Sequence, residues 1–249
     1  MRDSAGGRAV EARAFPWFVR IFRKGVDEQW GAGAIVGSGW VMTTAHAGLS
    51  AGRDQVCRAG QQERLPIVEV HPHPGFRCSW GQFDVCLVRF EPSVSSVGAW
   101  RLTQAGDTKV LGWNSTLNQL QLVEIRPATD ADCRDLLRDG RYVGSDAICG
   151  LSRKPGTSEP AQLQPGDSGG PLLSADLTRV VGVLSRGCET GPNGEPRLAA
   201  ALAIVITSSI AQWIQEVMDG RHEPFELPAC ERAYMSPLDP PHDENALDA

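Results

Sequence analysis

The stretch Gly166-Asp167-Ser168-Gly169-Gly170-Pro171 surrounds one serine with glycines. A serine hydroxyl is a weak nucleophile at neutral pH, so it needs a histidine base, and that base needs an acceptor to fix its tautomer. The attacked carbonyl also needs donors for its developing charge, and glycines let backbone N–H groups approach without a Cβ. The stretch therefore predicts a nucleophile loop, with Ser168 as nucleophile and the N–H groups of Gly166 and Ser168 as the oxyanion hole.

Chain order distinguishes two kinds of serine hydrolase. A Gly-x-Ser-x-Gly pattern also occurs in α/β-hydrolases, where serine, acid and histidine follow in that order on alternating strands and helices. Here the histidines after Ser168 are His222 and His242, in or near a polar tail, and no strand–helix alternation precedes the serine. The other order, histidine, aspartate, serine, is available upstream with His46 and Asp84.

The rest of the chain has the pattern of short strands separated by turns. Glycine and proline are plentiful, at 27 and 17 of 249 residues, which favours turns over long helices. Short segments with strand-like composition, most of them rich in β-branched or aromatic residues, fall at 17–22, 33–36, 39–44, 66–70, 83–90, 109–113, 119–125, 171–173 and 179–184. This spacing predicts an all-β fold with an antiparallel barrel or sandwich.

Two segments have helical spacing instead. Residues 130–137 fit a short helix, and residues 208–217 fit a better one because their apolar side chains recur at i, i+3, i+4 and i+7. We expect Ser208 to cap the start of the second helix and Gly220 to stop it. Residues 221–249 carry five prolines and several acids, and we expect the end of this tail to be mobile.

Composition argues against several classes of partner. The chain has 24 lysines and arginines against 30 aspartates and glutamates, a net charge of −6 and a pI near 5.4. With no basic cluster, we expect neither nucleic acid nor a membrane as a partner. No window reaches the roughly 18 consecutive apolar residues of a transmembrane helix. Residues 1–7 lack the apolar core of a signal peptide.

These motifs together resemble the trypsin/chymotrypsin family of serine peptidases, over roughly residues 4–219. Thr44-Ala45-His46 resembles the histidine motif of that family, residues 84–88 resemble its aspartate strand, and residues 166–171 match its serine motif. The resemblance implies an all-β fold of two antiparallel six-stranded β-barrels with a C-terminal helix.

The resemblance also implies boundaries. We expect one peptidase domain over residues 1–220, followed by the tail at 221–249. Within the domain, the first barrel would cover about 14–100, the second about 101–205, and the terminal helix about 207–219.

The family's chemistry transfers to matching positions. His46 would be the general base and then the general acid, Asp84 would orient it, and Ser168 would form the acyl-enzyme. Ser185 would hydrogen-bond Asp84. The implied activity is endopeptidase hydrolysis of a polypeptide substrate without a cofactor. Two alternatives remain: a non-catalytic homologue that binds a partner protein, and a serine esterase on the same fold.

The substrate pocket departs from the family pattern. Gln162, six residues before Ser168, stands where a trypsin-like preference for lysine or arginine requires aspartate, and a neutral amide offers no ion pair. Ser185-Arg186-Gly187 occupies the position of a family strand that binds the substrate backbone, with Arg186 in place of tryptophan. Gln162, Ser185, Arg186 and Gly187 are the candidate substrate-binding residues, with no preference predicted for the residue before the scissile bond.

The activation end departs as well. Family members are usually cut to free an Ile-Val-Gly-Gly-like terminus, whose amine pairs with the aspartate before the nucleophile, here Asp167. The corresponding stretch is Ser4-Ala5-Gly6-Gly7, in which the glycines fit and the apolar head does not. Either cleavage after Asp3 frees Ser4, or the protein becomes active without processing.

The seven cysteines leave at least one thiol unpaired within a monomer. Gly31 and Ala47 replace both halves of the family disulfide beside the histidine, and Gln164 replaces a cysteine beside the pocket. By the resemblance, Cys133 and Cys149 form a disulfide. The remaining cysteines are interpreted separately: Cys86 as a buried small hydrophobe, with the pairing of Cys57, Cys78, Cys188 and Cys230 left open.

Three further expectations complete the prediction. Cys188, His222, Cys230 and His242 lack zinc-ligand spacing, so no metal is expected. We expect His71 and His73 to be exposed loop histidines. The missing signal peptide and lost disulfides lean slightly toward the cytoplasm, with secretion, the family's habit, as the alternative.

Overall fold

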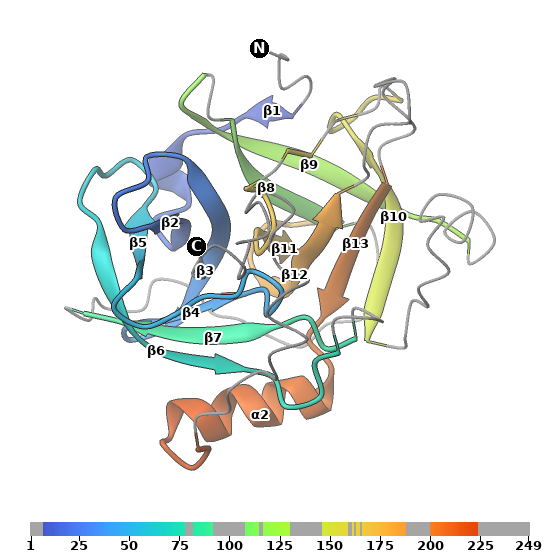
Figure 1. Ribbon diagram of the computed structural model, residues 1–249. Coiled ribbons are helices and arrows are strands. Elements are labelled where there is room, and N and C mark those ends of the chain that lie inside the picture. Colours follow the sequence, from blue (N-terminus) through green and yellow to red (C-terminus); the bar gives the residue numbers. More distant parts are fainter. Residues whose placement is uncertain are drawn as a thin grey trace, which may run out of the picture.

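The computed structural model describes residues 7–77, 82–91, 108–114, 117–129, 146–158, 161, 163–164, 166–187 and 200–223. Their strands form two β-barrels that lie beside each other, with a helix at one end of the molecule (Figure 1). The prediction of an all-β fold with two antiparallel six-stranded barrels and a C-terminal helix is confirmed.

The first barrel is a closed ring of antiparallel strands in the order β2-β3-β4-β7-β6-β5. The ring closes where β2 pairs with β5, from Val19 opposite Arg58 to Arg23 opposite Asp54. Its strands are β2 (Phe18–Arg23), β3 (Gln29–Gly37), β4 (Trp40–Thr43), β5 (Asp54–Arg58), β6 (Leu65–Pro72) and β7 (Cys86–Phe90).

The second barrel closes in the order β8-β9-β10-β13-β12-β11, with β11 pairing back to β8. A two-residue strand, β1 (Arg8–Ala9), adds to the edge of β9 at Gln121 and Leu122. The beginning of the described chain is thus attached to the second barrel, although it precedes the first. The strands are β8 (Thr108–Asn114), β9 (Gln119–Pro127), β10 (Ala147–Arg153), β11 (Pro171–Leu173), β12 (Val180–Gly187) and β13 (Ala200–Val205).

Alternation along the strands sends side chains to two different cores. On β2, Val19 and Ile21 point into the first barrel, whereas Phe18 belongs to a cluster outside it. On β4, Val41 lies inside and Met42 outside. A strand with a period of two is apolar on both faces only where both faces are covered, and here a second barrel covers the outer face.

The outer cluster, called the shared core below, joins both barrels and the terminal helix. It takes side chains from β2, β3, β4 and β7 of the first barrel, and from β8, β9, β11, β12 and β13 of the second. Its buried members include Phe15, Phe18, Met42, Leu87, Leu111, Trp113, Leu122, Val183, Ile204, Ile210, Trp213 and Ile214. This packing fixes how the two barrels sit against each other.

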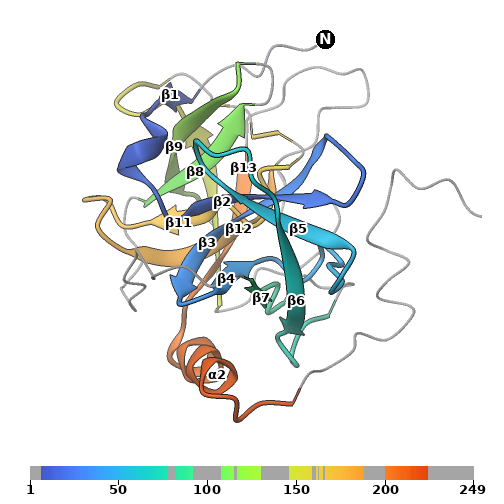
Figure 2. The ribbon, with the colours of Figure 1, turned by 90° about the vertical axis from the view of Figure 1, so that its left-hand side faces the viewer.

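Helix α2 (Ser208–Met218) lies at one end of the molecule in both views (Figures 1 and 2). It buries the apolar face that its spacing predicted. The predicted cap is wrong: Thr207, not Ser208, is the N-cap, because Thr207 Oγ1 accepts the N–H of Ile210 while its own backbone is extended. Gly220 ends the helix with φ 69° and donates its N–H to the carbonyl of Val217.

Each of the nine segments predicted as strands overlaps an observed strand. Sequence analysis missed β1, β5, β10 and β13. The predicted helix at 130–137 and the tail beyond residue 223 lie outside the described residues. In the part of the chain that is described, no helix has the length and apolar character needed to span a membrane.

Candidate active site

Asp84 is the central residue of the candidate site, because it contacts both His46 and Ser185. It lies two residues before the start of β7 and is fully buried. Its Oδ2 lies 2.6 Å from His46 Nδ1 and accepts the hydroxyl of Ser185 on β12 at 2.5 Å, while its Oδ1 accepts the backbone N–H of His46 at 2.8 Å. Burial alone would raise the pKa of Asp84, but the interactions with His46 and Ser185 outweigh it and hold that pKa below its ordinary value.

The backbone around Asp84 is held in an unusual conformation. Phe83 has a positive φ of 48°, a region that aromatic residues rarely adopt, and its N–H donates to Asp146 Oδ2 at 3.0 Å. The N–H of Val85 turns back to the carbonyl of Phe83 at 2.6 Å. Asp146, directly before β10 of the second barrel, thus fixes the turn that presents Asp84 from the first barrel.

The prediction that His71 and His73 are exposed loop histidines is wrong. They are 4% and 9% exposed. The ring of His73 stacks on Phe83 at 4.6 Å and meets Trp213 of α2 edge-on at 4.8 Å. Burial lowers the pKa of His73 to about 4, so the ring is neutral at pH 7. The neutral ring of His73 therefore packs between Trp213 of α2 and Phe83, the residue before Asp84.

The nucleophile loop needs its glycines. Gly166 and Gly169 have φ of 95° and 85°, a region that favours glycine. A Cβ on Gly169 would collide with the carbonyl oxygen of Ala32 and the hydroxyl of Thr43. The loop therefore lies directly against β3 and β4 of the first barrel, which no larger residue at Gly169 would permit.

Backbone hydrogen bonds attach the Ser168 loop to both barrels. The Ser168 carbonyl accepts the N–H of Ala32 on β3 at 2.8 Å. The next residue, Gly169, donates to the carbonyl of Leu184 at 2.8 Å, and Leu184 immediately precedes Ser185, the partner of Asp84. Among the described residues, no protein acceptor takes the N–H of Ser168, which leaves it able to donate to a ligand.

His46 and Ser168 do not form a hydrogen bond with each other in the structure; among the described residues, the imidazole bonds only to Asp84. The His46 side chain is 27% exposed, and no described residue hydrogen-bonds its second nitrogen. Contacts between nucleophile and base are often long in ligand-free enzymes and tighten when substrate binds. The structure thus joins His46 and Ser185 directly to Asp84, and backbone hydrogen bonds attach the Ser168 loop to β3 and to Leu184, the residue before Ser185.

Asp167 is buried beneath the nucleophile loop. Its Oδ1 accepts the N–H of Trp113 at 2.9 Å, and its Oδ2 accepts the N–H of Gln164 at 2.8 Å. A Cβ on Gly112 would lie 2.6 Å from Oδ1, so the carboxyl occupies space that only glycine leaves free. Burial raises the pKa of Asp167 to about 6 against these two hydrogen bonds. The expected amine partner, Ser4, lies outside the described residues, so that pairing stays a prediction.

This pKa has a consequence for stability. Because the folded state holds the Asp167 proton more tightly than the unfolded chain, the stabilisation is complete below pH 4 and is lost as the pH rises through about 6. We expect the wild type to lose about 2 kcal/mol relative to Asp167→Asn between pH 4 and pH 8. Urea unfolding of both proteins across this range measures it. A wild type that instead gains stability relative to the variant would show that a cation pairs with the carboxylate.

The remaining predicted site residues are only partly described. Gln162 lies outside the described residues. Ser185 is buried on β12, and Arg186 and Gly187 continue that strand opposite Leu202 and Ala201 of β13. Within the described part of the chain, no group of three or more histidine, cysteine or acidic side chains could hold a metal ion.

The cysteines can be placed in part. Cys86 is buried and free as predicted, and burial raises the pKa of its thiol. Cys57, whose pairing was left open, is also buried and free. Cys149 lies buried on β10, but Cys133 is outside the described residues, so their disulfide stays a prediction. Cys78 is likewise outside.

Sequence analysis missed Phe83, Asp146 and His73, which position Asp84. No local pattern identifies them, because each is defined by a contact with a distant segment. Around His73, the stretch His-Pro-His-Pro-Gly at residues 71–75 combines polar residues with turn formers. This pattern predicts a surface loop, so it gave no indication of a buried contact.

A buried aspartate bonded to a histidine, together with a glycine-lined serine loop and two β-barrels, is the arrangement found in the two-barrel class of serine peptidases. The family model for trypsin matches residues 4–214, and the chain therefore belongs to the trypsin family of serine peptidases.

Individual relatives are distant. The chain is 27% identical to human Serine protease 56, over 97% of this chain and 42% of that protein, so it spans less than half the length of that relative. It is 24% identical to Trypsin alpha of Drosophila erecta and 25% identical to Trypsin alpha of Drosophila melanogaster, in both cases over 80% of this chain and 83% of the relative.

Proposed function

We propose that the chain is a serine endopeptidase that hydrolyses peptide bonds through an acyl-enzyme on Ser168. The observation that carries the proposal is the environment of His46: a fully buried carboxylate, Asp84, engages its Nδ1 at 2.6 Å and its backbone N–H at 2.8 Å. A buried aspartate held in this way fixes the tautomer whose Nε2 can accept a proton, which is the condition for activating a serine.

The proposed reaction has two halves. His46 Nε2 takes the proton of Ser168 Oγ as that oxygen attacks the substrate carbonyl, and the N–H groups of Gly166 and Ser168 receive the negative oxygen. His46 then gives the proton to the departing amine as the C–N bond breaks, leaving the acyl group on Ser168. Water, deprotonated by His46, attacks this ester, and the proton returns to Ser168 when the acid leaves. Asp84 stays ionised throughout and stabilises the imidazolium.

Substrate would lie along the outer end of β12. We propose that Ser185, Arg186 and Gly187 bind its backbone, and that Gln162 contributes to the pocket for the residue before the scissile bond. Two features support this: Ser185 links the strand to Asp84 at 2.5 Å, and Leu184 supports the nucleophile loop at 2.8 Å. These two bonds fix the position of β12 relative to both Asp84, the partner of His46, and the nucleophile loop.

A fluorophosphonate probe tests the proposal, since it labels only a serine that is activated. We expect labelling of the folded protein at Ser168, located by peptide mapping, and none of the Ser168→Ala variant. Folded wild type that stays unlabelled would identify the protein as a non-catalytic homologue. Labelled protein that turns over small esters but cleaves no member of a peptide library would identify an esterase.

A further inference from the structure

A glutamine of the first barrel bonds to the nucleophile loop of the second. Gln29, the first residue of β3, donates from Nε2 to the carbonyl oxygen of Gly166 at 2.8 Å. Gly166 is one of the two residues proposed to form the oxyanion hole with their backbone N–H groups. The two partners are 137 positions apart in the chain, so the bond joins the two barrels at the loop that carries Ser168.

The contact starts from a β-bulge in β3. Consecutive residues of β2 pair first with Gly31 and then with Gln29, so Trp30 between them is an extra residue. Bulges redirect neighbouring side chains and are over-represented next to active sites. Trp30 donates its indole N–H to the carbonyl of Ala47 at 2.8 Å, directly after His46. The bulge therefore connects β3 both to the serine loop and to the segment that carries the histidine.

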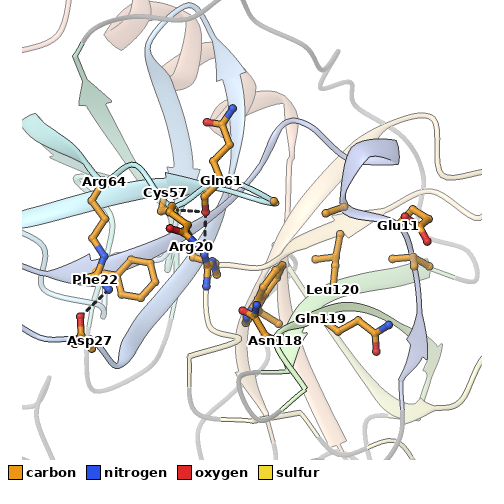
Figure 3. A pocket seen from close by; sticks show the side chains of 15 residues that line it. Glu11, Arg20, Phe22, Asp27, Cys57, Gln61, Arg64, Asn118, Gln119 and Leu120 are labelled. Carbon is orange, nitrogen blue, oxygen red and sulfur yellow. Dashed lines mark hydrogen bonds and ion pairs between the residues drawn. The ribbon is translucent and has the colours of Figure 1, made fainter.

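The chain that leads into β3 is held against the first barrel. Arg64 donates from Nη1 to the carbonyl of Val26 at 2.9 Å, and from Nη2 to the carboxylate of Asp27 at 3.1 Å (Figure 3). Its guanidinium also lies 4.0 Å from the ring of Phe22, which pairs with Gln29 across β2 and β3. The side chain of Gln29 thus extends from a restrained backbone, and it can hold a partner in place.

Glycine does not by itself keep the conformation that Gly166 adopts. Its φ is 95°, and a residue without a Cβ reaches the opposite sign of φ about as readily. The direction of its N–H therefore depends on contacts with other residues. The peptide between Gly166 and Asp167 is held at both ends, because Gln29 donates to its carbonyl and its N–H donates to the carbonyl of Gln164 at 3.0 Å. Of these two bonds, only the one from Gln29 comes from outside the loop.

The amide of Gln29 also carries an unsatisfied atom. Its Oε1 is buried and has no hydrogen-bond partner among the described residues. Turning the amide over would place that oxygen against the carbonyl oxygen of Gly166, where neither atom can donate. An unpaired buried acceptor destabilises a fold. An apolar side chain of the same size would avoid this loss, so the stability of the barrel does not explain why a glutamine stands here.

We propose that Gln29 is a positioning residue for the oxyanion hole: its bond to Gly166 holds the N–H of that glycine in the direction that receives the negative oxygen. This role rests on the proposed peptidase function and adds a requirement to it. Gln29 acts through Gly166 rather than on the substrate. Donors that are arranged before the reaction begins stabilise the transition state without reorganising, which is the largest single contribution to the rate of many enzymes.

Removing the donor while keeping the length of the side chain tests the proposal. We expect Gln29→Met to lower kcat about 30-fold with little change in KM, less than the roughly 10²–10³-fold that follows outright loss of an oxyanion donor. Gly166 is only partly buried, so water can reach its vacated carbonyl. Thermal unfolding should occur at the wild-type temperature or above, because the unpaired Oε1 is gone. A purely structural glutamine would give the opposite result, a lower unfolding temperature with unchanged kcat.

Two further variants separate the donor from the rest of the side chain. Gln29→Glu keeps the shape but presents only acceptors at neutral pH, so it should lose at least as much kcat as Gln29→Met. It also serves as the test if Gln29→Met does not fold. Gln55→Met makes the same replacement on β5 of the same barrel, where the glutamine is also half-buried. This control should keep wild-type kcat.

Hydrogen exchange followed by NMR measures the restraint without depending on catalysis. The N–H of Asp167 belongs to the same peptide as the carbonyl of Gly166, so it should exchange about tenfold faster in Gln29→Met and at the wild-type rate in Gln55→Met. Wild type that resists the fluorophosphonate probe would count against the proposed function alone, and exchange would then decide whether Gln29 restrains the loop.

Three results would overturn the role of Gln29. The first is a folded Gln29→Met variant that keeps at least about half of the wild-type kcat. The second is a loss confined to KM, which would place Gln29 in substrate binding. The third is exchange of the Asp167 N–H that is the same in Gln29→Met and in the wild type.

Discussion

Replacing His46 with alanine is expected to lower kcat by about 10⁶-fold while changing KM little, the loss that follows removal of the base in a serine peptidase. Ser168 would then have no acceptor for its proton, and the leaving amine would have no donor. The measurement is kcat and KM on a peptide selected from a cleavage library. The variant should stay folded, because the imidazole is 27% exposed and bonds only Asp84 among the described residues.

His222→Ala is the matched control for this variant. His222 is partly exposed beyond α2, its Nδ1 lies 2.8 Å from the carbonyl of Glu223, and it contacts the ring of Trp213 edge-on at 6.4 Å, but it makes no hydrogen bond to His46, Asp84 or Ser185. It should retain wild-type kcat. A loss of less than 100-fold in His46→Ala would contradict the assignment of His46 as the base.

Replacing Asp84 with asparagine is expected to lower kcat by about 10⁴-fold, less than loss of the base itself. An amide cannot accept from His46 Nδ1, the His46 N–H and the Ser185 hydroxyl together, as the carboxylate does. Presenting its NH₂ to Nδ1 would hold the wrong tautomer. The measurement is kcat on the same peptide, alongside thermal unfolding to show that the fold persists.

Asp54→Asn offers a control with the same chemistry in the same barrel. Asp54 is also fully buried, where it accepts the N–H of Ser50 at 2.6 Å and pairs with Arg53 at 2.9 Å. This variant should lose stability without losing kcat. If Asp84→Asn and Asp54→Asn reduced kcat equally, Asp84 would be a structural residue rather than one that orients His46.

The candidate site could be predicted from sequence to the extent that its chemistry is local. Ser168 was identifiable because the glycines that permit the loop are its neighbours, and the clash that a Cβ at Gly169 would cause shows why they are required. His46 and Asp84 followed from chain order. Asp146 and Phe83 could not be found, because their contact joins residues 63 positions apart and neither has a distinctive neighbour.

The fold was predictable where strands are rich in β-branched residues and was missed where they are not. Strand β13 begins Ala200-Ala201-Leu202-Ala203, and alanine has low strand propensity, so the composition of this segment did not predict a strand. Its assignment depends on its place between β10 and β12. The position of the helix cap has a similar reason: Thr207 and Ser208 are equally good caps, and only the backbone conformation decides between them.

The shared core bears on how the protein is made. The first barrel leaves the ribosome while Phe18, Met42 and Leu87 still lack the second barrel and α2 that cover them. Such a partly synthesised chain exposes an apolar surface, and chaperones bind intermediates of this kind. His46 and Asp84 are likewise synthesised before Ser185 and the nucleophile loop, which come later in the chain. The bond between Asp84 and Ser185 therefore cannot form until β12 has been synthesised and has docked on the first barrel.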